Sequence, residues 1–200
     1  MHTLSSLVLC GGAARRMQGR DKPLALWAKD TLVSHILRTL PEGPVLISAN
    51  RSLAEYRALG FPVIEDGDHQ GPLAGIAAAA LFIDKATTKG EQQSDSERYL
   101  YVVAGDTPKL PANLARQLLA CCMANNAVAA CAEAERLHPL PLLVRLDALQ
   151  TLPDYLAEGR RSVLGWLRTL NHATLSLADQ EALFVNINTP EELERLNTFS

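Results

Sequence analysis

From residue 9 to residue 22 the chain reads Leu9-Cys10-Gly11-Gly12-Ala13-Ala14-Arg15-Arg16-Met17-Gln18-Gly19-Arg20-Asp21-Lys22. The apolar run 7–9, at the start of this segment, predicts a buried strand, and a Gly-Gly turn and four cationic side chains follow it. Glycines let backbone N–H groups approach an anion closely, and nearby cations neutralise its charge. A strand that opens into such a loop indicates a binding site for nucleotide phosphates.

This loop differs from the two best-known phosphate loops. Lys22 is followed by Pro23 and is not preceded by glycine, so the pattern G-x-x-x-x-G-K-[ST] is absent. Gly11 and Gly12 are adjacent and the next glycine is Gly19, so G-x-G-x-x-G is absent as well. The alternative interpretation is a surface turn with solvated arginines.

The composition restricts the class of protein. Two hundred residues suffice for one domain with a proper core. The formal net charge of −3 argues against a general nucleic-acid binder. No apolar run approaches the ~18 residues that a membrane span needs. The four cysteines include no C-x-x-C pair typical of a zinc or redox site. We therefore expect a cytoplasmic protein that binds neither nucleic acids nor membranes.

Apolar runs of strand length alternate with stretches of helical periodicity in the first half of the chain. Strands are predicted at 7–9, 45–49, 61–64 and 99–104. Helices are predicted at 31–40, from the capping box Ser52-x-x-Glu55 to just before Gly60, at 73–83, and from Pro111 to about 124. Such alternation predicts an α/β fold with a parallel sheet and helices on both faces.

The second half is less regular. Strands are predicted at 127–131, 140–144 and 184–187, and helices around Pro153, at 163–170, and from Thr189-Pro190 onward. Residues 84–98 are polar and aperiodic, which indicates an exposed loop. We expect a single domain over 1–200: a three-layer sandwich with a mostly parallel central sheet and a Rossmann-like nucleotide-binding half over about 1–108.

The carboxyl ends of the predicted strands carry the polar residues. In open α/β sheets, ligands lie at this edge. The strand ends are Gly11-Gly12 with the arginines, Ser48-Ala49-Asn50-Arg51, Glu65-Asp66 and Gly105-Asp106-Thr107-Pro108. Mg²⁺ usually takes one or two carboxylates together with substrate phosphates and water. Asp106 is the best candidate ligand because it follows a buried strand closely, although a capping role is the alternative; for Asp66, an ordinary Asp-Gly turn is equally plausible.

Three further motifs carry weaker signals. His138-Pro139 indicates a substrate loop, although a lone histidine is more often structural. Arg160-Arg161 adds two cations, for which a solvated pair is the ordinary interpretation. Asn186 and Asn188 would project to the same side of a strand, although turn formation before Thr189 explains Asn188 equally well.

Together these residues resemble the molybdenum cofactor guanylyltransferases, which are glycosyltransferase-A-like nucleotidyltransferases. The resemblance begins with L-x-G-G-x-x-x-R-M and the following D-K, and it spans nearly the whole chain. The other matching motifs are Ala49-Asn50-Arg51, Val63-Ile64-Glu65-Asp66, Gly71-Pro72-Leu73-Ala74-Gly75, Asp106-Thr107-Pro108, His138-Pro139, Gly159-Arg160-Arg161 and Asn186-Ile187-Asn188-Thr189-Pro190-Glu191-Glu192-Leu193.

The resemblance implies transfer of GMP from GTP to the terminal phosphate of molybdenum-bound molybdopterin, with release of pyrophosphate and with Mg²⁺ held by Asp106. The implied nucleotide-binding residues are Leu9, Cys10, Gly11, Gly12, Lys22, Ser48, Asn50, Asp66, Leu73 and Asp106. Catalysis would involve Lys22, Asp106, Arg16 and Arg161. The pterin acceptor would be bound in the second half, about 109–200, by His138, Arg161, Asn186 and Asn188. Molybdoenzyme chaperones or molybdopterin-handling proteins would be further partners of a monomeric enzyme.

The sequence departs from the family pattern at a few positions. Ser48 stands where an asparagine that contacts the nucleotide is common, and Cys10, Gln18 and Pro23 replace smaller residues of the loop. The alternatives are a nucleotidyltransferase that uses CTP on the same pterin or an NTP on a sugar phosphate, and a non-catalytic nucleotide-binding or cofactor-delivery module. A dinucleotide-dependent oxidoreductase is disfavoured because G-x-G-x-x-G is absent.

Overall fold

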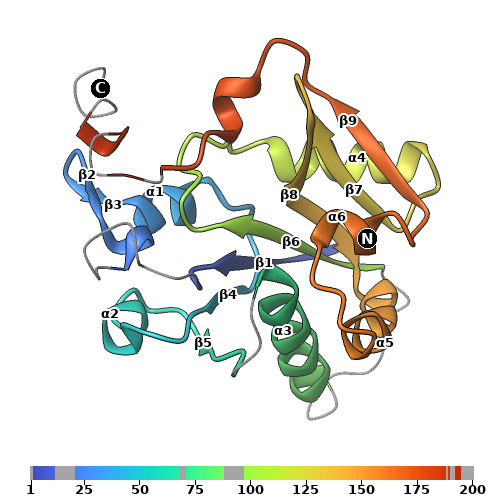
Figure 1. Cartoon of the computed structure of the whole chain (residues 1–200), viewed down its shortest axis with the longest axis horizontal. Coiled ribbons are helices and arrows are strands. Elements are labelled where there is room, and N and C mark those ends of the chain that lie inside the picture. The colour runs from blue at the N-terminus through green and yellow to red at the C-terminus, as the bar shows by residue number, and fades with distance from the viewer. Residues whose placement is uncertain are drawn as a thin grey trace.

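The computed structural model describes residues 2–11, 21–67, 71–87, 97–187, 189 and 192–194 of the chain. Seven strands form one sheet in the order β5-β4-β1-β6-β8-β7-β9 (Figure 1). Their bounds are β1 Thr3–Leu9, β4 Val45–Ser48, β5 Val63–Ile64, β6 Arg98–Ala104, β7 Ala129–Glu133, β8 Leu137–Arg145 and β9 His172–Ser176. Strand β8 runs antiparallel to β6 and β7, and every other pairing in the sheet is parallel. The predicted mostly parallel sheet is confirmed.

Helices cover both faces of the sheet. Helices α1 (Leu32–Thr39), α2 (Leu53–Arg57) and α4 (Leu114–Ala124) pack on one face, and α3 (Pro72–Thr87), α5 (Leu152–Ala157) and α6 (Val163–Leu167) pack on the other. Side chains of β1 alternate between the two cores, because successive residues of a strand point to opposite faces. Val8 and Cys10 join the first core, and Leu7 and Leu9 join the second. The three-layer sandwich is therefore confirmed.

Short elements complete the chain. A two-stranded hairpin, β2 (Leu26–Trp27) and β3 (Asp30–Thr31), leads into α1. The 3-10 helices are η2 (Lys22–Leu24), η3 (Leu146–Thr151) and η4 (Glu181–Phe184). No helix in the described part of the chain has the length and apolar character that crossing a membrane requires.

Two element predictions for the second half are corrected. Residues 184–187 form no strand: η4 ends at Phe184, and the backbone N–H of Ile187 donates to the carbonyl of Asp106 instead of joining a ladder. The strand that does complete the sheet is β9, which pairs with β7; its sequence, His-Ala-Thr-Leu-Ser, alternates polar and apolar residues, but two apolar side chains are too short a pattern to predict a strand.

The two capping boxes differ in outcome. Ser52 adopts a left-handed φ of 49° and its side chain caps nothing in α2, so the first predicted box is wrong. The second is confirmed: the N–H of Glu192 donates to Thr189 Oγ1 at 3.2 Å, and the N–H of Thr189 donates to the Glu192 carboxylate at 3.2 Å.

The predicted loop 84–98 is shorter at its amino end. Helix α3 continues to Thr87, because its alanine-rich sequence has a high helix propensity, and β6 begins at Arg98. Residues 88–96 lie outside the described residues.

The strand order places a ligand site at a definite point. Strands β4 and β6 flank β1 on its two sides, so the chain reverses its winding direction at β1. In open α/β sheets, ligands bind at such a switch point, outside the carboxyl ends of the strands. The carboxyl ends of β1 and β6 point to the left in Figure 1.

Candidate active site

The ends of β1 and β6 approach each other closely at Gly105. Its N–H donates to the carbonyl of Leu9 at 2.8 Å. A Cβ at this position would lie 2.9 Å from Cys10 Sγ and 3.1 Å from the carbonyl oxygen of Leu9. A larger residue here would force the Cys10 side chain and the end of β1 to shift, and the next residue, Asp106, is placed against the end of β1.

Asp106 forms an ion pair with Lys22, the first residue of η2. The two side chains are 19% and 20% exposed, so ligands can still reach both. Pro23 is buried at the start of η2 and fixes the backbone there. The structure thus brings together a cation and a carboxylate that are 84 residues apart, at the edge that the sequence predicted.

Thr107 links this pair to the C-terminal part of the chain. Its hydroxyl, in a residue that is 5% exposed, donates to Asn186 Oδ1 at 3.0 Å. Together with the bond from Ile187 to the carbonyl of Asp106, this contact places Asn186 beside the carboxylate. Asn186 thus reaches the site from an irregular segment rather than from the predicted strand.

A second polar cluster lies at the ends of β4 and β5. Asn50 Oδ1 accepts the N–H of Asp66 at 3.1 Å, and Asn50 Nδ2 donates to the Asp66 carboxylate. Ser48 Oγ donates to Asp66 Oδ2 at 3.4 Å. A Cβ on Gly11 would lie 3.9 Å from the same Oδ2. Gly11, just after β1, and the second cluster therefore lie at the same edge of the sheet.

The start of α3 packs tightly under this edge. A Cβ at Gly75 would lie 2.7 Å from both Leu9 Cδ2 and Ser48 Oγ. Leu73 is fully buried and Ser48 is 1% exposed. The side chains of Leu73 and Ser48 therefore face the core, so Leu73 can meet a ligand only through its backbone.

Cys10 is a packing residue in this structure. It is 3% exposed, and burial raises the pKa of its thiol far above the ordinary value, which keeps it protonated and poorly nucleophilic. The buried hydroxyl of Tyr56 lies near this thiol and near the Asp21 carboxyl, without a hydrogen bond of good geometry. Burial raises the pKa of Asp21, while Ser52 and Arg51 lower it to a smaller extent.

His138 lies on β8 and contacts η4. It is 7% exposed, its Nε2 lies 2.8 Å from Glu181 Oε2, and its ring stacks on Phe184 with a centroid separation of 4.1 Å. Glu181 also accepts from Arg136 Nε at 3.1 Å. These contacts fix η4 just before Asn186. The predicted contact of His138 with a pterin stays a prediction.

The hydrogen bond between His138 and Glu181 should make the free energy of unfolding depend on pH. Its hydrogen bond to His138, ahead of the other contributions, lowers the pKa of Glu181 below its ordinary value of 4.5. A carboxyl group whose pKa is lower in the folded protein than in the unfolded chain stabilises the fold fully at a pH above the unfolded-state pKa. This stabilisation is lost as the pH falls through the folded-state pKa. We expect Glu181→Gln to lower the melting temperature at pH 6–7, with the difference from wild type shrinking below about pH 4.5. A difference that stayed constant down to pH 3 would contradict this role.

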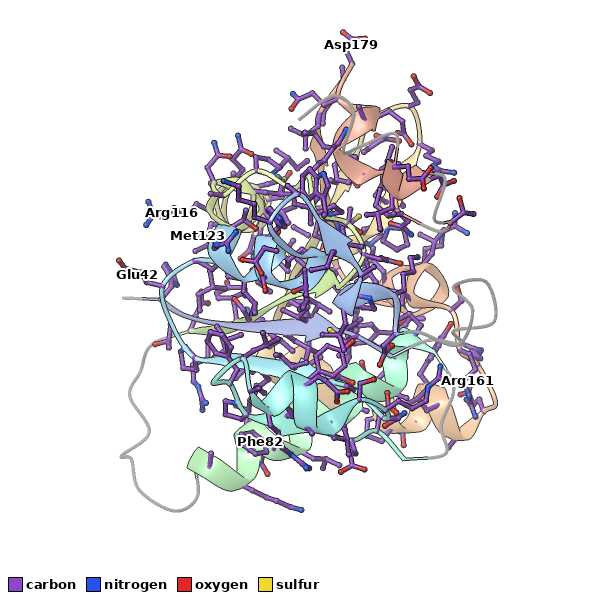
Figure 2. All side chains as sticks on the ribbon, turned by 90° about the vertical axis from the view of Figure 1, so that its left-hand side faces the viewer. Glu42, Phe82, Arg116, Met123, Arg161 and Asp179 are labelled. Atoms are coloured by element: carbon purple, nitrogen blue, oxygen red, sulfur yellow. The ribbon has the colours of Figure 1, made fainter. Side chains whose placement is uncertain are left out.

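The remaining predicted residues are less well connected to the site. Arg161 is exposed after α5, where its guanidinium donates at 2.7 Å to each of the carbonyls of Leu156 and Arg160; Figure 2 shows it at the right-hand side of the molecule. Its role in catalysis and pterin binding stays a prediction. Gly12, Arg16 and Asn188 lie outside the described residues.

Sequence reasoning missed Thr107 and Glu181 as functional neighbours. Thr107 was visible only as part of the motif after β6. Glu181 gave no signal at all, because its partner His138 is 43 residues away and a single glutamate in a polar segment is unremarkable in sequence.

Comparison with known proteins agrees with this geometry. The MobA-like NTP transferase domain family matches residues 6–174. The chain is 36% identical to the molybdenum cofactor guanylyltransferase of Shewanella sp. (strain MR-4), over 96% of this chain and 94% of that protein. It is 33% identical to the enzyme of the same name from Haemophilus influenzae, over 96% and 97%.

Solved structures show the same fold. Molybdopterin-guanine dinucleotide biosynthesis protein A from Archaeoglobus fulgidus superposes with a TM-score of 0.75 at 22% identity, covering 98% of this chain and 97% of that one. A 4-diphosphocytidyl-2C-methyl-D-erythritol synthase from Anaerococcus prevotii superposes with a TM-score of 0.71 at 10% identity, covering 98% and 95%. On the extent of the family match and of the whole-length relatives, the chain belongs to the MobA-like NTP transferase domain family.

Proposed function

We propose that this protein transfers GMP from GTP to the terminal phosphate of molybdenum-bound molybdopterin, forming the guanine dinucleotide cofactor and releasing pyrophosphate. The observation that carries the proposal is the Lys22–Asp106 pair at the switch point, on the same edge of the sheet as Gly11 and the carboxylate of Asp66. The relatives named molybdenum cofactor guanylyltransferase support GTP as the nucleotide, rather than CTP on the same pterin or an NTP on a sugar phosphate.

The reaction mainly requires that the two substrates be positioned and that their negative charges be neutralised. The attacking group is a phosphate oxygen of the pterin, which is already anionic and needs no general base. A bond forms between this oxygen and the α-phosphorus of GTP, and the bond from that phosphorus to the bridging oxygen of the β-phosphate breaks. Bringing two anions together and stabilising the charge that develops is the work of cations and oriented N–H groups. Lys22 supplies such a cation, and Arg16 is predicted to supply a second.

The residues fit a Mg²⁺ ion that arrives together with the nucleotide. Within the described residues, no group of three or more His, Cys, Asp or Glu side chains could hold a metal by itself. Asp106 offers one carboxylate, and Mg²⁺ commonly combines one carboxylate with substrate phosphates and water. When bound, Mg²⁺ neutralises charge on the phosphates. In the structure Lys22 forms an ion pair with Asp106, and a triphosphate would compete for Lys22 and release the carboxylate.

The pterin is expected in the second half of the chain, about 109–200. Of the residues predicted to bind the pterin, Asn186 lies beside the site, where Thr107 donates a hydrogen bond to it. Arg161, His138 and Asn188 remain predicted contributors. The cytoplasmic location, the monomeric state and transfer to molybdoenzyme chaperones or molybdopterin-handling proteins also remain predictions of the sequence.

A nucleotide titration tests the proposal directly. Melting temperatures would be measured with GTP, CTP, ATP and UTP, each with and without Mg²⁺. At a hundred times the Kd, a ligand adds about 2.7 kcal/mol, which raises the melting temperature of a protein of this size by roughly 5–10 °C. We expect that shift for GTP with Mg²⁺ and smaller shifts for the others. A larger shift with CTP would contradict the guanylyl assignment, and no shift with any nucleotide would favour a delivery module.

A further inference from the structure

Asn50 is predicted to bind the nucleotide, yet its amide group is already engaged within the protein. Its Oδ1 accepts the N–H of Asp66, and its Nδ2 donates both to the Asp66 carboxylate and, at 3.4 Å, to the carbonyl of Gly67. A side-chain amide has one acceptor oxygen and two N–H donors. Both ends of the Asn50 amide are therefore directed at the segment that carries Asp66.

Ser48 is removed from direct recognition for a different reason. It is 1% exposed, and its hydroxyl is enclosed by Gly75 and Asp66. Asp66 therefore offers the carboxylate of this cluster, and the one bond that Ser48 gives it is long, at 3.4 Å.

The two carboxylate oxygens of Asp66 are differently placed. Oδ1 is held by Asn50, whereas Oδ2, among the residues that the structure describes, has the long contact with Ser48 alone and lies toward Gly11. An ionised carboxylate only accepts hydrogen bonds. The group of a nucleoside that it binds is therefore a donor, either an N–H of the base edge or a hydroxyl of the ribose.

We propose that Asn50 is a positioning residue that acts through Asp66: it does not touch the nucleotide, but it fixes the carboxylate so that Oδ2 accepts a hydrogen bond from the nucleoside. This inference rests on the proposed function only in taking the ligand to be a nucleotide. A carboxylate held in one rotamer loses less conformational entropy when the ligand binds, so the bond from Asn50 strengthens nucleotide binding without a contact of its own.

A double-mutant cycle tests the proposal. The Kd of GTP with Mg²⁺ would be measured by calorimetry for wild type, Asn50→Ala, Asp66→Ala and the double variant. We expect Asn50→Ala to weaken binding about tenfold. We expect the double variant to bind no more weakly than Asp66→Ala, since Asn50 has no task once the carboxylate is gone. Losses that multiply in the double variant would overturn the proposal, because Asn50 would then act independently.

Two further variants distinguish a role of Asn50 in positioning Asp66 from a general effect on the stability of the protein. Asn50→Asp keeps the shape but removes the N–H donor and sets a second carboxylate against Asp66, so it should bind GTP more weakly than Asn50→Ala. Asn125→Ala is the matched control: this exposed asparagine also donates its amide to a backbone carbonyl, that of Cys121 at 2.8 Å, but at the end of α4. Its Kd should equal that of wild type. Equal losses in Asn50→Ala and Asn50→Asp would contradict the charge argument.

Nucleotide analogues identify the donor. ITP lacks the 2-amino group of guanine, and 2′-deoxy-GTP and 3′-deoxy-GTP each lack one ribose hydroxyl. Wild type should discriminate against the analogue that lacks the donor, and Asn50→Ala should lose most of that discrimination. Unchanged ratios for all three analogues would overturn the proposal while leaving GTP binding intact. If wild type prefers CTP, the same cycle is run with CTP, so the proposed function fails and the coupling is still measured; if no nucleotide binds, both fail.

Discussion

Asp106→Asn is expected to lower kcat for Mg²⁺-dependent GMP transfer by about 10²–10³-fold, which is the usual effect of removing one preorganised electrostatic group from an active site. The change keeps the size of the side chain but removes the charge that would hold Mg²⁺ against the phosphates. Because Asp106 is fixed between Gly105 and Thr107 at the end of β6, the variant keeps the position and loses only the chemistry. Steady-state kinetics at saturating GTP measures the effect.

A matched control makes this result specific. Asp147 is also an ion-paired aspartate, and its partner is Arg145. Arg145 lies opposite Tyr99 in the β6–β8 ladder, near the other end of β6 from Asp106. Asp147→Asn should leave kcat unchanged. Both variants would be compared with wild type by thermal melting, so that loss of activity in a folded protein can be recognised. Turnover near the wild-type rate in folded Asp106→Asn would remove Asp106 from the mechanism.

Periodicity was sufficient to predict the sheet because its central strands are strongly apolar. Strands β1 and β6 have consecutive buried residues, since both faces are covered, and their order along the chain follows from the alternation with helices. The strand at the β9 edge of the sheet was harder to predict. Strand β9 is partly exposed and therefore mixed in composition, whereas Phe184-Val185-Asn186-Ile187 has the composition of a strand but pairs with none of the strands of the sheet. Which of these two segments forms a strand depends on pairing with a strand distant in the sequence, and a short sequence window carries no information about that pairing.

The candidate site was predictable in outline for the same topological reason. The rule that ligands lie at the carboxyl ends of strands placed Gly11, Asp66 and Asp106 on one edge, and the structure agrees for these residues. What sequence could not give is pairing: Lys22 with Asp106, Asn50 with Asp66, and His138 with Glu181. Each is a contact between different elements, so it depends on packing rather than on local pattern.

Lys22→Met is expected to weaken binding of GTP with Mg²⁺ by about 10–100-fold, since a charge-assisted hydrogen bond to phosphate is worth roughly 1.5–3 kcal/mol. Methionine keeps the length and the apolar stem while removing the positive charge. The rate should fall as well, because the developing negative charge on the phosphates loses a cation. Lys22→Arg keeps the charge but changes the donor geometry, so it should recover affinity more than rate. Unchanged affinity and turnover in Lys22→Met would refute the phosphate role.

The same variant separates the two tasks of Lys22 by a readout that needs no turnover. The ammonium group of Lys22 forms an ion pair with Asp106, so a divalent cation must compete with it for the carboxylate. Removing the charge should therefore let Mn²⁺ alone bind more tightly to Lys22→Met than to wild type, even though GTP binds more weakly. Titration of Mn²⁺ by electron paramagnetic resonance, without nucleotide, measures this, and Asp106→Asn should abolish the gain. The two opposite changes in affinity follow from one ion pair: a triphosphate that attracts Lys22 away from Asp106 makes the carboxylate more available to the metal, and removal of the lysine charge does the same without nucleotide.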